Sequence, residues 1–258
     1  MSGNRPARRW ITWASAVPER WQMKGFKQWI LPLALILGGA AAIAIAVTGG
    51  SGHGLAPGDL LLVLACSVLL SGCIVLLPAL PAGLLPCLQG GVLAAVAFLL
   101  LAAAGLPAAP PLLLRVAAGV GILLFMLASL SSLLQRAGVD RPAAAWWVIL
   151  ATGLLASSTV WSGPLLDTLA PGRPVIDSII ASSPLSYLAT LAEWDYLRGE
   201  WFYRHAPFGG LRYDYLSAST VSLACLGIGL AAQLASRLLT PGQQSKGGLN
   251  RSPTPSQP

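Results

Sequence analysis

Charged residues are scarce in this chain. Only 10% of its 258 residues are charged, whereas 55% are hydrophobic, and the mean hydropathy is +0.70. Soluble domains carry about a quarter charged residues, so this composition is that of a chain solvated largely by lipid. Between Gln28 and Gln135 the only charged residues are Asp59 and Arg115. Stretches this long with so little charge are typical of membrane-spanning segments.

Histidine, lysine and cysteine are also rare, and their scarcity excludes several chemistries. Two histidines do not build a typical metal cluster, so neither a metal nor a cofactor is expected. None of the three lysines stands in a G-x-x-x-x-G-K-[ST] loop, so the chain is not expected to hydrolyse ATP by that route. The four cysteines lie in or beside apolar runs without a C-x-x-C pair, which predicts small buried hydrophobic residues. The basic residues form no single tract, so no nucleic-acid partner is expected.

Six apolar segments are long enough to cross a bilayer. A helix rises 1.5 Å per residue, so crossing ~30 Å of hydrocarbon takes roughly 20 residues. The predicted spans are Trp29–Val47, Leu60–Leu77, Leu88–Leu106, Pro111–Leu134, Ala143–Trp161 and Ala218–Leu239. The expected fold is an all-α polytopic membrane protein whose six transmembrane helices form one domain, residues 29–239.

Lysine and arginine set the expected orientation, because they collect in cytoplasmic flanks. Six of the sixteen basic residues precede Trp29, and Arg136, Arg141 and Arg237 flank later spans. The first connection, residues 48–59, has no lysine or arginine, and residues 162–217 carry four arginines against six acids. Six crossings place all the basic flanks on one side, which predicts that both termini are cytoplasmic.

Two segments lie outside the predicted spans at the ends of the chain. The basic leader, residues 1–28, carries Trp10, Trp13, Val17 and Trp21 at three- and four-residue spacing. This pattern predicts an interfacial amphipathic helix within residues 7–28, with a flexible basic leader as the alternative. Residues 240–258 are rich in Ser, Pro, Gly and Gln and are predicted to be a disordered cytoplasmic tail.

The predicted spans contain no Asp, Glu or His, the residues that a proton-coupled carrier holds inside the bilayer. Arg115 is near one end of its span, where it is expected to extend to the outer interface. At the bilayer centre an arginine would cost about 2.5–3.5 kcal/mol on insertion scales. If the protein moves a substrate, the energy is therefore expected from another chain.

Three stretches, taken in order, resemble permease subunits of ABC transporters of the ABC-2 type. The first stretch, residues 71–81 (SGCIVLLPALP), is similar to that family's coupling helix. It is followed by residues 84–88 and by Gly-Gly-Val, which resembles the entry to the family's third span. Residues 127–155 are similar to its fourth and fifth helices with the short basic turn between them. Residues 183–188 (SPLSYL) resemble a run that precedes its last span. The resemblance covers residues 8–239 and is closest to the branch associated with gliding motility and copper-enzyme maturation.

This resemblance implies a location, partners and a coupling site. It implies a multi-pass protein of the bacterial cytoplasmic (inner) membrane, with short outer re-entrant or interfacial helices between spans five and six. The implied partners are a separate cytoplasmic ABC ATPase and a second permease subunit, identical or different. Val75 stands where the family usually has a Glu, and no Arg or Lys follows Pro81. The residues implied to form the ATPase-coupling turn are Ser71, Gly72, Pro78, Pro81, Gly83 and Gln89.

The extracytoplasmic segment, residues 162–217, contains all five tyrosines of the chain. One interpretation is an interfacial belt, in which aromatic rings lie at the headgroup level and arginines pair with nearby acids. The other is a periplasmic gate or partner surface. Its candidate residues are Pro184, Tyr187, Trp194, Asp195, Arg198, Trp201, Arg204 and His205. A single histidine, His205, is thin evidence for haem or copper binding.

The favoured hypothesis is a membrane-spanning permease subunit of an ATP-driven exporter, a transport protein with no ATPase site of its own and hence not an enzyme. The alternative is a non-transport membrane anchor or assembly factor for a periplasmic or membrane enzyme complex. The uncharged coupling stretch favours that alternative. A membrane enzyme is the third hypothesis, and no nucleophile–base pair or metal set supports it.

Overall fold

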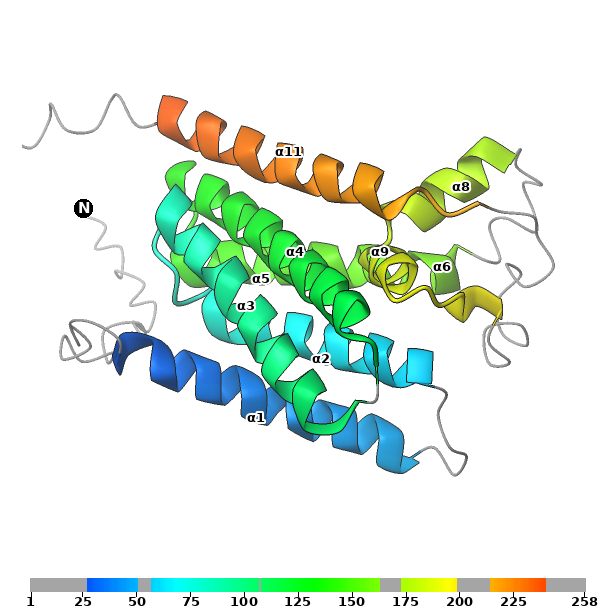
Figure 1. The fold of residues 1–258 in the computed structure, drawn as a ribbon. Coiled ribbons are helices and arrows are strands. Elements are labelled where there is room, and N and C mark those ends of the chain that lie inside the picture. Colours follow the sequence, from blue (N-terminus) through cyan, green and yellow to red (C-terminus); the bar gives the residue numbers. More distant parts are fainter. Residues whose placement is uncertain (1–26, 51–56, 107, 163–172, 199–213, 240–258) are drawn as a thin grey trace, which may run out of the picture.

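The computed structural model describes residues 27–50, 57–106, 108–162, 173–198 and 214–239. These residues form helices joined by turns and contain no strand, which confirms the predicted all-helical fold (Figure 1). The predicted interfacial helix and the predicted tail lie outside the described residues, apart from the end of the leader. The elements are α1 (Lys27–Gly50), α2 (Pro57–Leu76), α3 (Leu84–Gly105), α4 (Pro110–Arg136), α5 (Arg141–Ala156), α6 (Ser158–Trp161), α8 (Arg173–Ser182), α9 (Pro184–Leu191), η3 (Tyr196–Arg198) and α11 (Ala218–Leu238).

Four of the described helices are long and apolar enough to cross a membrane. They are the segments Gly58–Leu76, Leu84–Ala104, Pro110–Arg136 and Ala218–Leu238. Two further apolar segments are shorter. They are Ile30–Ile45, which lies within α1, and Arg141–Ala156, which is α5. The helices therefore have the character of a membrane protein.

The third apolar helix begins one turn earlier than predicted. α3 starts at Leu84 rather than Leu88, and it includes Pro86. The first amides of a helix have no acceptor within that helix, so a proline in the first turn removes no hydrogen bond. Gly83 precedes the helix with φ 157° and ψ 158°, a conformation that is essentially restricted to glycine.

The single helix predicted over Ala143–Trp161 is divided in the structure. α5 ends at Ala156, and the short α6 follows after Ser157. The Ser157 hydroxyl donates to the backbone oxygens of Gly153 (2.9 Å) and Leu154 (3.2 Å). Such bonds let a side chain compete with the helical ladder, which accounts for the break at this serine.

The six apolar helices run between the same two ends of the bundle (Figure 1). At one end α1 begins, α2 ends, α4 ends, α5 begins and α11 ends, which brings Arg136, Arg141 and Arg237 to that end. We call it the basic end. The opposite end, here the acidic end, carries Asp59 at the start of α2 and the short helices α6, α8, α9 and η3.

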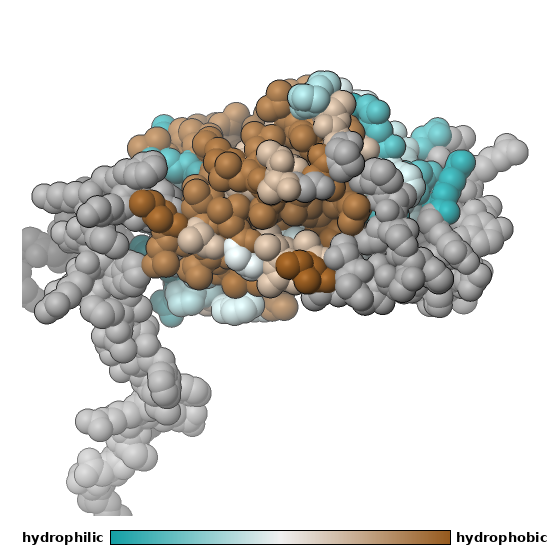
Figure 2. All heavy atoms as spheres, turned by 60° about the horizontal axis from the view of Figure 1, so that its bottom comes forward, coloured by the Kyte–Doolittle hydropathy of each residue, from teal (hydrophilic) through white to brown (hydrophobic). Residues whose placement is uncertain are grey.

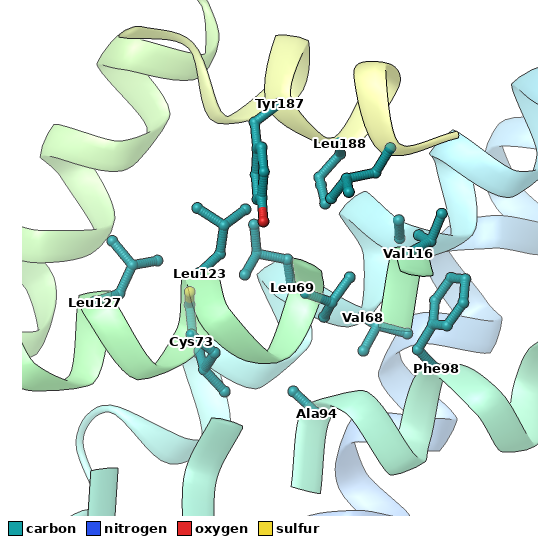
Figure 3. Close-up of a cluster of buried hydrophobic side chains, with 14 of the residues drawn as sticks. Val68, Leu69, Cys73, Ala94, Phe98, Val116, Leu123, Leu127, Tyr187 and Leu188 are labelled. Atoms are coloured by element: carbon teal, nitrogen blue, oxygen red, sulfur yellow. The ribbon is translucent and has the colours of Figure 1, made fainter. Parts of the chain in front are cut away.

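α4 is the central helix, since it packs against α2, α3, α5, α9 and α11. Its backbone comes close to that of α3 where the two helices cross, since a Cβ added to Gly91 would lie 2.6 Å from the backbone oxygen of Gly121. Glycines at a crossing let two helix backbones approach, as is common between membrane helices. Figure 3 shows Phe98 of α3 and Leu123 of α4 within the apolar core.

The cysteines are free and lie among the apolar helices. Cys73, Cys87 and Cys225 are buried, and Cys66 is half-buried, which confirms their predicted role as small packing residues. A polar contact joins α11 to α3 within the core, where Gln233 Nε2 donates to Cys87 Sγ (3.2 Å).

The surface between the two ends is hydrophobic. Figure 2 shows this on the side of the bundle where α1 lies. Large apolar side chains are exposed on every long helix, among them Ile45, Val92, Leu154 and Leu223 at 61–69%. A soluble monomer rarely exposes apolar patches larger than about 300–600 Å². Lipid is the solvent that suits this surface.

Candidate functional site

The acidic end contains the best-defined cluster of polar and aromatic contacts. We call the stretch from Ser183 to Arg198 the α9–η3 segment. Pro184 occupies the first turn of α9, and Ser183 precedes it with an extended backbone. This Ser-Pro pair therefore starts a helix, as a proline at the first helical position does. The Ser183 hydroxyl donates to the backbone oxygen of Ala156 (3.4 Å), linking the segment to the end of α5.

α9 ends in a turn that glycine usually makes. The amide of Glu193 donates to the oxygen of Thr190 (3.3 Å), and the amide of Trp194 donates to that of Ala189 (3.0 Å). This pair of bonds is the Schellman arrangement, which requires a left-handed residue after the helix. Glu193 is that residue, with φ 55°, and it is the sole non-glycine residue with positive φ in the described part of the chain. A residue with a side chain pays roughly 1–2 kcal/mol for this conformation.

Glu193 forms an ion pair with the start of α4. Arg115 Nη1 lies 2.6 Å from Glu193 Oε1, joining residues 78 positions apart. The two side chains are 43% and 67% exposed, so solvent screening limits the pair to about 0.2–1 kcal/mol. Arg115 thus lies at the acidic end, where the ion pair links the turn after α9 to the start of α4.

Trp194 covers the start of α2. A Cβ added to Gly58 would lie 2.5 Å from Trp194 Cε3, so glycine is required there by the close approach of the indole ring. The tryptophan is half-buried rather than fully exposed. It joins the α9–η3 segment to the second apolar helix.

Hydrogen bonds attach the same segment to α11 and to the residues just before it. Tyr215 donates to Asp195 Oδ1 (2.8 Å), and Arg198 pairs with Asp195 Oδ2 (3.1 Å), one of the pairings expected for an interfacial belt. The Tyr187 hydroxyl lies 2.7 Å from Ser222 Oγ of α11. Tyr187 is only 3% exposed and points from α9 into the core toward Leu123 (Figure 3), so it lies inside the bundle and not on a surface.

A second tyrosine closes the segment on itself. The Tyr196 hydroxyl lies 2.9 Å from Ser186 Oγ, and both residues are buried. Burial raises the pKa of the Tyr187 and Tyr196 phenols, so both remain protonated hydroxyls that can donate. Of the remaining candidates for a gate or partner surface, Trp201, Arg204 and His205 lie outside the described residues.

The structure separates the residues of the predicted coupling turn into two groups. Ser71 and Gly72 are buried within α2, where Ser71 faces Gly39 of α1 and Gly72 faces Leu124 of α4. They cannot touch a cytoplasmic partner directly. The second group lies at the surface of the basic end: Pro78 and Gly83 are half-buried in the turn, whereas Pro81 and Gln89 are exposed.

The turn between α2 and α3 is held against two helices. Arg136 Nη2 of α4 lies 3.5 Å from the oxygen of Ala82. The amide of Leu80 donates to Leu76 (2.8 Å), and the Leu80 side chain packs on Gly90, where an added Cβ would approach it to 2.8 Å. These contacts join the turn to α2, α3 and α4.

Within the described part of the chain, no three His, Cys, Asp or Glu side chains are grouped so as to hold a metal ion.

Sequence reasoning identified Trp194, Asp195 and Arg198 but missed Gly58, Tyr215 and Ser222, which complete the same contacts. Their partners are distant in sequence, so no local pattern marks them.

Comparison with protein-family models, with curated proteins and with solved structures gives no match for this chain.

Proposed function

We propose that this chain is the membrane-spanning subunit of an ATP-driven exporter, energised by a separate cytoplasmic ABC ATPase. It crosses the bacterial inner membrane six times, with α1 and the α5–α6 pair completing the four longer spans. The basic end faces the cytoplasm, as the positive-inside rule requires. A second permease subunit, identical or different, lies beside it.

One observation carries the proposal: the α2–α3 turn has exposed residues and also contacts the helices of the bundle. Ala79, Pro81 and Gln89 are open to contact, while Arg136 and Leu80 hold the turn to the rest of the bundle. A partner that binds here can move the helices as bodies, which is what alternating access requires. Asp59, in the first turn of α2, is the one acid in these apolar helices, and their interiors supply no acid or histidine to harness a proton gradient.

At the acidic end, the α9–η3 segment fits the role of a gate. It touches α2 through Trp194, α4 through Arg115 and α11 through Ser222, and Tyr215 joins it to the residues just before α11. Movement of these helices relative to each other strains all of these contacts at once. A movement of these helices would therefore change the conformation of the α9–η3 segment at the acidic end.

The test is co-purification in mild detergent with an ATPase subunit encoded beside this chain. Ala79→Asp places a charge on the exposed turn and leaves the conformation of Gly83 intact. We expect this variant to lose ATPase binding and the stimulation of ATP hydrolysis. Ser219→Asp is the matched control, because it adds the same charge at an exposed position of the acidic end. Equal binding by both variants would argue against coupling through the turn.

The uncharged turn favours a second candidate, a membrane anchor or assembly factor for an enzyme complex. Residues 77–83 contain no charged side chain, so an ATPase would have to dock there through apolar contact alone. An anchor would retain its partner in the Ala79→Asp variant and would lose it when the acidic end is altered. Pull-down from cells that lack any neighbouring ATPase gene separates the two functions.

A further inference from the structure

A lateral groove of about 780 Å³ opens on the side of the bundle between α4, α5, α9 and α11. α5 and α11 each pack on α4 but run along different sides of it (Figure 1). The groove follows α4 from Leu123 to Leu134, a distance of about 16 Å at 1.5 Å per residue. That length is close to half of the ~30 Å hydrocarbon thickness, the depth of one leaflet.

The lining of the groove is suited to a hydrocarbon chain. Leucines of α4, Trp147 and Ala151 of α5, and Ala224 of α11 line its walls, and its polar side chains are few. Two of them, Thr152 and Tyr187, already have hydrogen-bond partners in Val148 and Ser222. The groove therefore offers few hydrogen-bonding groups to a ligand that is polar along its length. Contact in such a groove comes from dispersion between closely packed apolar atoms.

Two arginines flank, in sequence, the residue that lines the groove nearest the basic end, although neither lines the groove itself. Val139 lines the groove and stands between Arg136 and Arg141, both of which are exposed. Asp140 offsets one of these charges, and Arg237 adds another at the same end, on α11. Both ion pairs formed between described side chains lie at the acidic end, so Arg136 and Arg141 have no carboxylate partner among these residues, although Arg136 also contacts the oxygen of Ala82 (3.5 Å). Basic pockets between membrane helices bind anionic lipid headgroups.

We infer that the lateral groove binds one anionic phospholipid of the surrounding membrane. One acyl chain lies along α4 between α5 and α11, and the phosphate contacts Arg136 and Arg141. Trp147 lies between the two, at the level where an indole ring suits the boundary between hydrocarbon and headgroup. This inference does not depend on transport, since a membrane anchor with the same groove would bind the same lipid.

The first experiment compares the lipids retained by the full-length protein after extraction in mild detergent. We expect phosphatidylglycerol or cardiolipin to be enriched over phosphatidylethanolamine relative to the membrane itself. Native mass spectrometry from nanodiscs of phosphatidylcholine doped with phosphatidylglycerol should show one retained anionic lipid per chain. Retention in proportion to membrane composition would overturn the inference, because it would mean that bulk lipid fills the groove.

Two kinds of variant test the headgroup and acyl contacts separately. Each arginine near a membrane surface contributes about 1 kcal/mol to binding of anionic lipid, which is roughly fivefold in affinity. Arg136→Gln with Arg141→Gln should therefore weaken retention by roughly thirtyfold. Arg198→Gln removes a charge at the acidic end and should leave retention unchanged. Equal loss in both would show that Arg136 and Arg141 have no special role.

Ala224→Trp fills the groove from α11, where Ala224 is exposed and has room for a larger side chain. It should abolish lipid retention. Leu223→Trp is the matched control, because the adjacent Leu223 is 69% exposed and does not line the groove. Size-exclusion profiles and unfolding temperatures verify that each variant is folded. If Ala224→Trp changes the oligomeric state and leaves lipid retention intact, the groove is a contact between two copies and the inference fails.

Discussion

The left-handed turn at Glu193 provides a direct test of how the acidic end is held together. Glu193 combines an unfavourable backbone, with φ 55°, and a favourable ion pair with Arg115 at 2.6 Å. Replacing Glu193 with Gln removes the charge and keeps the strained backbone. Replacing it with Gly removes the charge and the strain together. The two variants, each made with Arg115 and with Arg115→Gln, separate the two contributions.

The structure sets the expected magnitudes. The ion pair is half-exposed, so Glu193→Gln should lower the free energy of unfolding by about 0.2–1 kcal/mol when Arg115 is present, and by almost nothing when it is absent. Relief of the left-handed conformation is worth roughly 1–2 kcal/mol. The greater freedom of glycine in the unfolded chain offsets about 0.5–1 kcal/mol of this gain. Glu193→Gly should therefore be about 0.5–1 kcal/mol more stable than Glu193→Gln in either background.

Thermal unfolding in detergent micelles, followed by circular dichroism, measures these differences. A change of 1 kcal/mol shifts the midpoint by roughly 2–4 °C in a chain of this size. The decisive comparison is between Gly and Gln at position 193 in the Arg115→Gln background, where the ion pair is absent. If glycine is the less stable of the two there, the left-handed turn does not hold in the protein and our account of how α9 ends is wrong.

Three further substitutions test the packing. Gly121→Val should force α3 and α4 apart and lower stability by about 1–3 kcal/mol, whereas Gly227→Val, which has open space around it, should be nearly neutral in the same unfolding assay. Gly58→Val should displace Trp194 and lower the stability. In the Trp194→Ala background the same substitution should cost much less, which a double-mutant cycle measures. Tyr187→Phe should cost about 0.5–1.5 kcal/mol by removing the bond to α11; an unchanged midpoint would exclude that bond.

Several features of the fold could be predicted because they follow from local composition. Apolar runs without charge indicate helices in lipid, since each backbone amide must bond within its own segment there. The Ser183–Pro184 pair indicates a helix start, and the cysteines without a motif indicate packing residues. The prediction placed the start of α3 one turn too late, at Leu88, whereas the helix includes Pro86 in its first turn, where a proline costs no hydrogen bond.

The candidate site was less predictable. Gln89 and Pro81 are exposed at the basic end, but Ser71 and Gly72, placed in the coupling turn on the basis of the resemblance, are buried in the helix before it. A motif that crosses a helix boundary does not show which of its residues face outward. The break after Ala156 was missed because the fifth apolar run contains no glycine or proline at that point, and the Ser157 hydroxyl bonds to the helix instead.

The sequence by itself determined that the helices of this chain are apolar enough for a membrane and which connections carry basic charge. These properties depend on composition along short stretches, and the free energy of lipid solvation adds up residue by residue. Only the tertiary structure decided which side chains meet. Arg115 meets Glu193, Gly58 meets Trp194, and Gln233 meets Cys87, 146 positions away, because helix packing brings distant residues together in ways that no local pattern encodes.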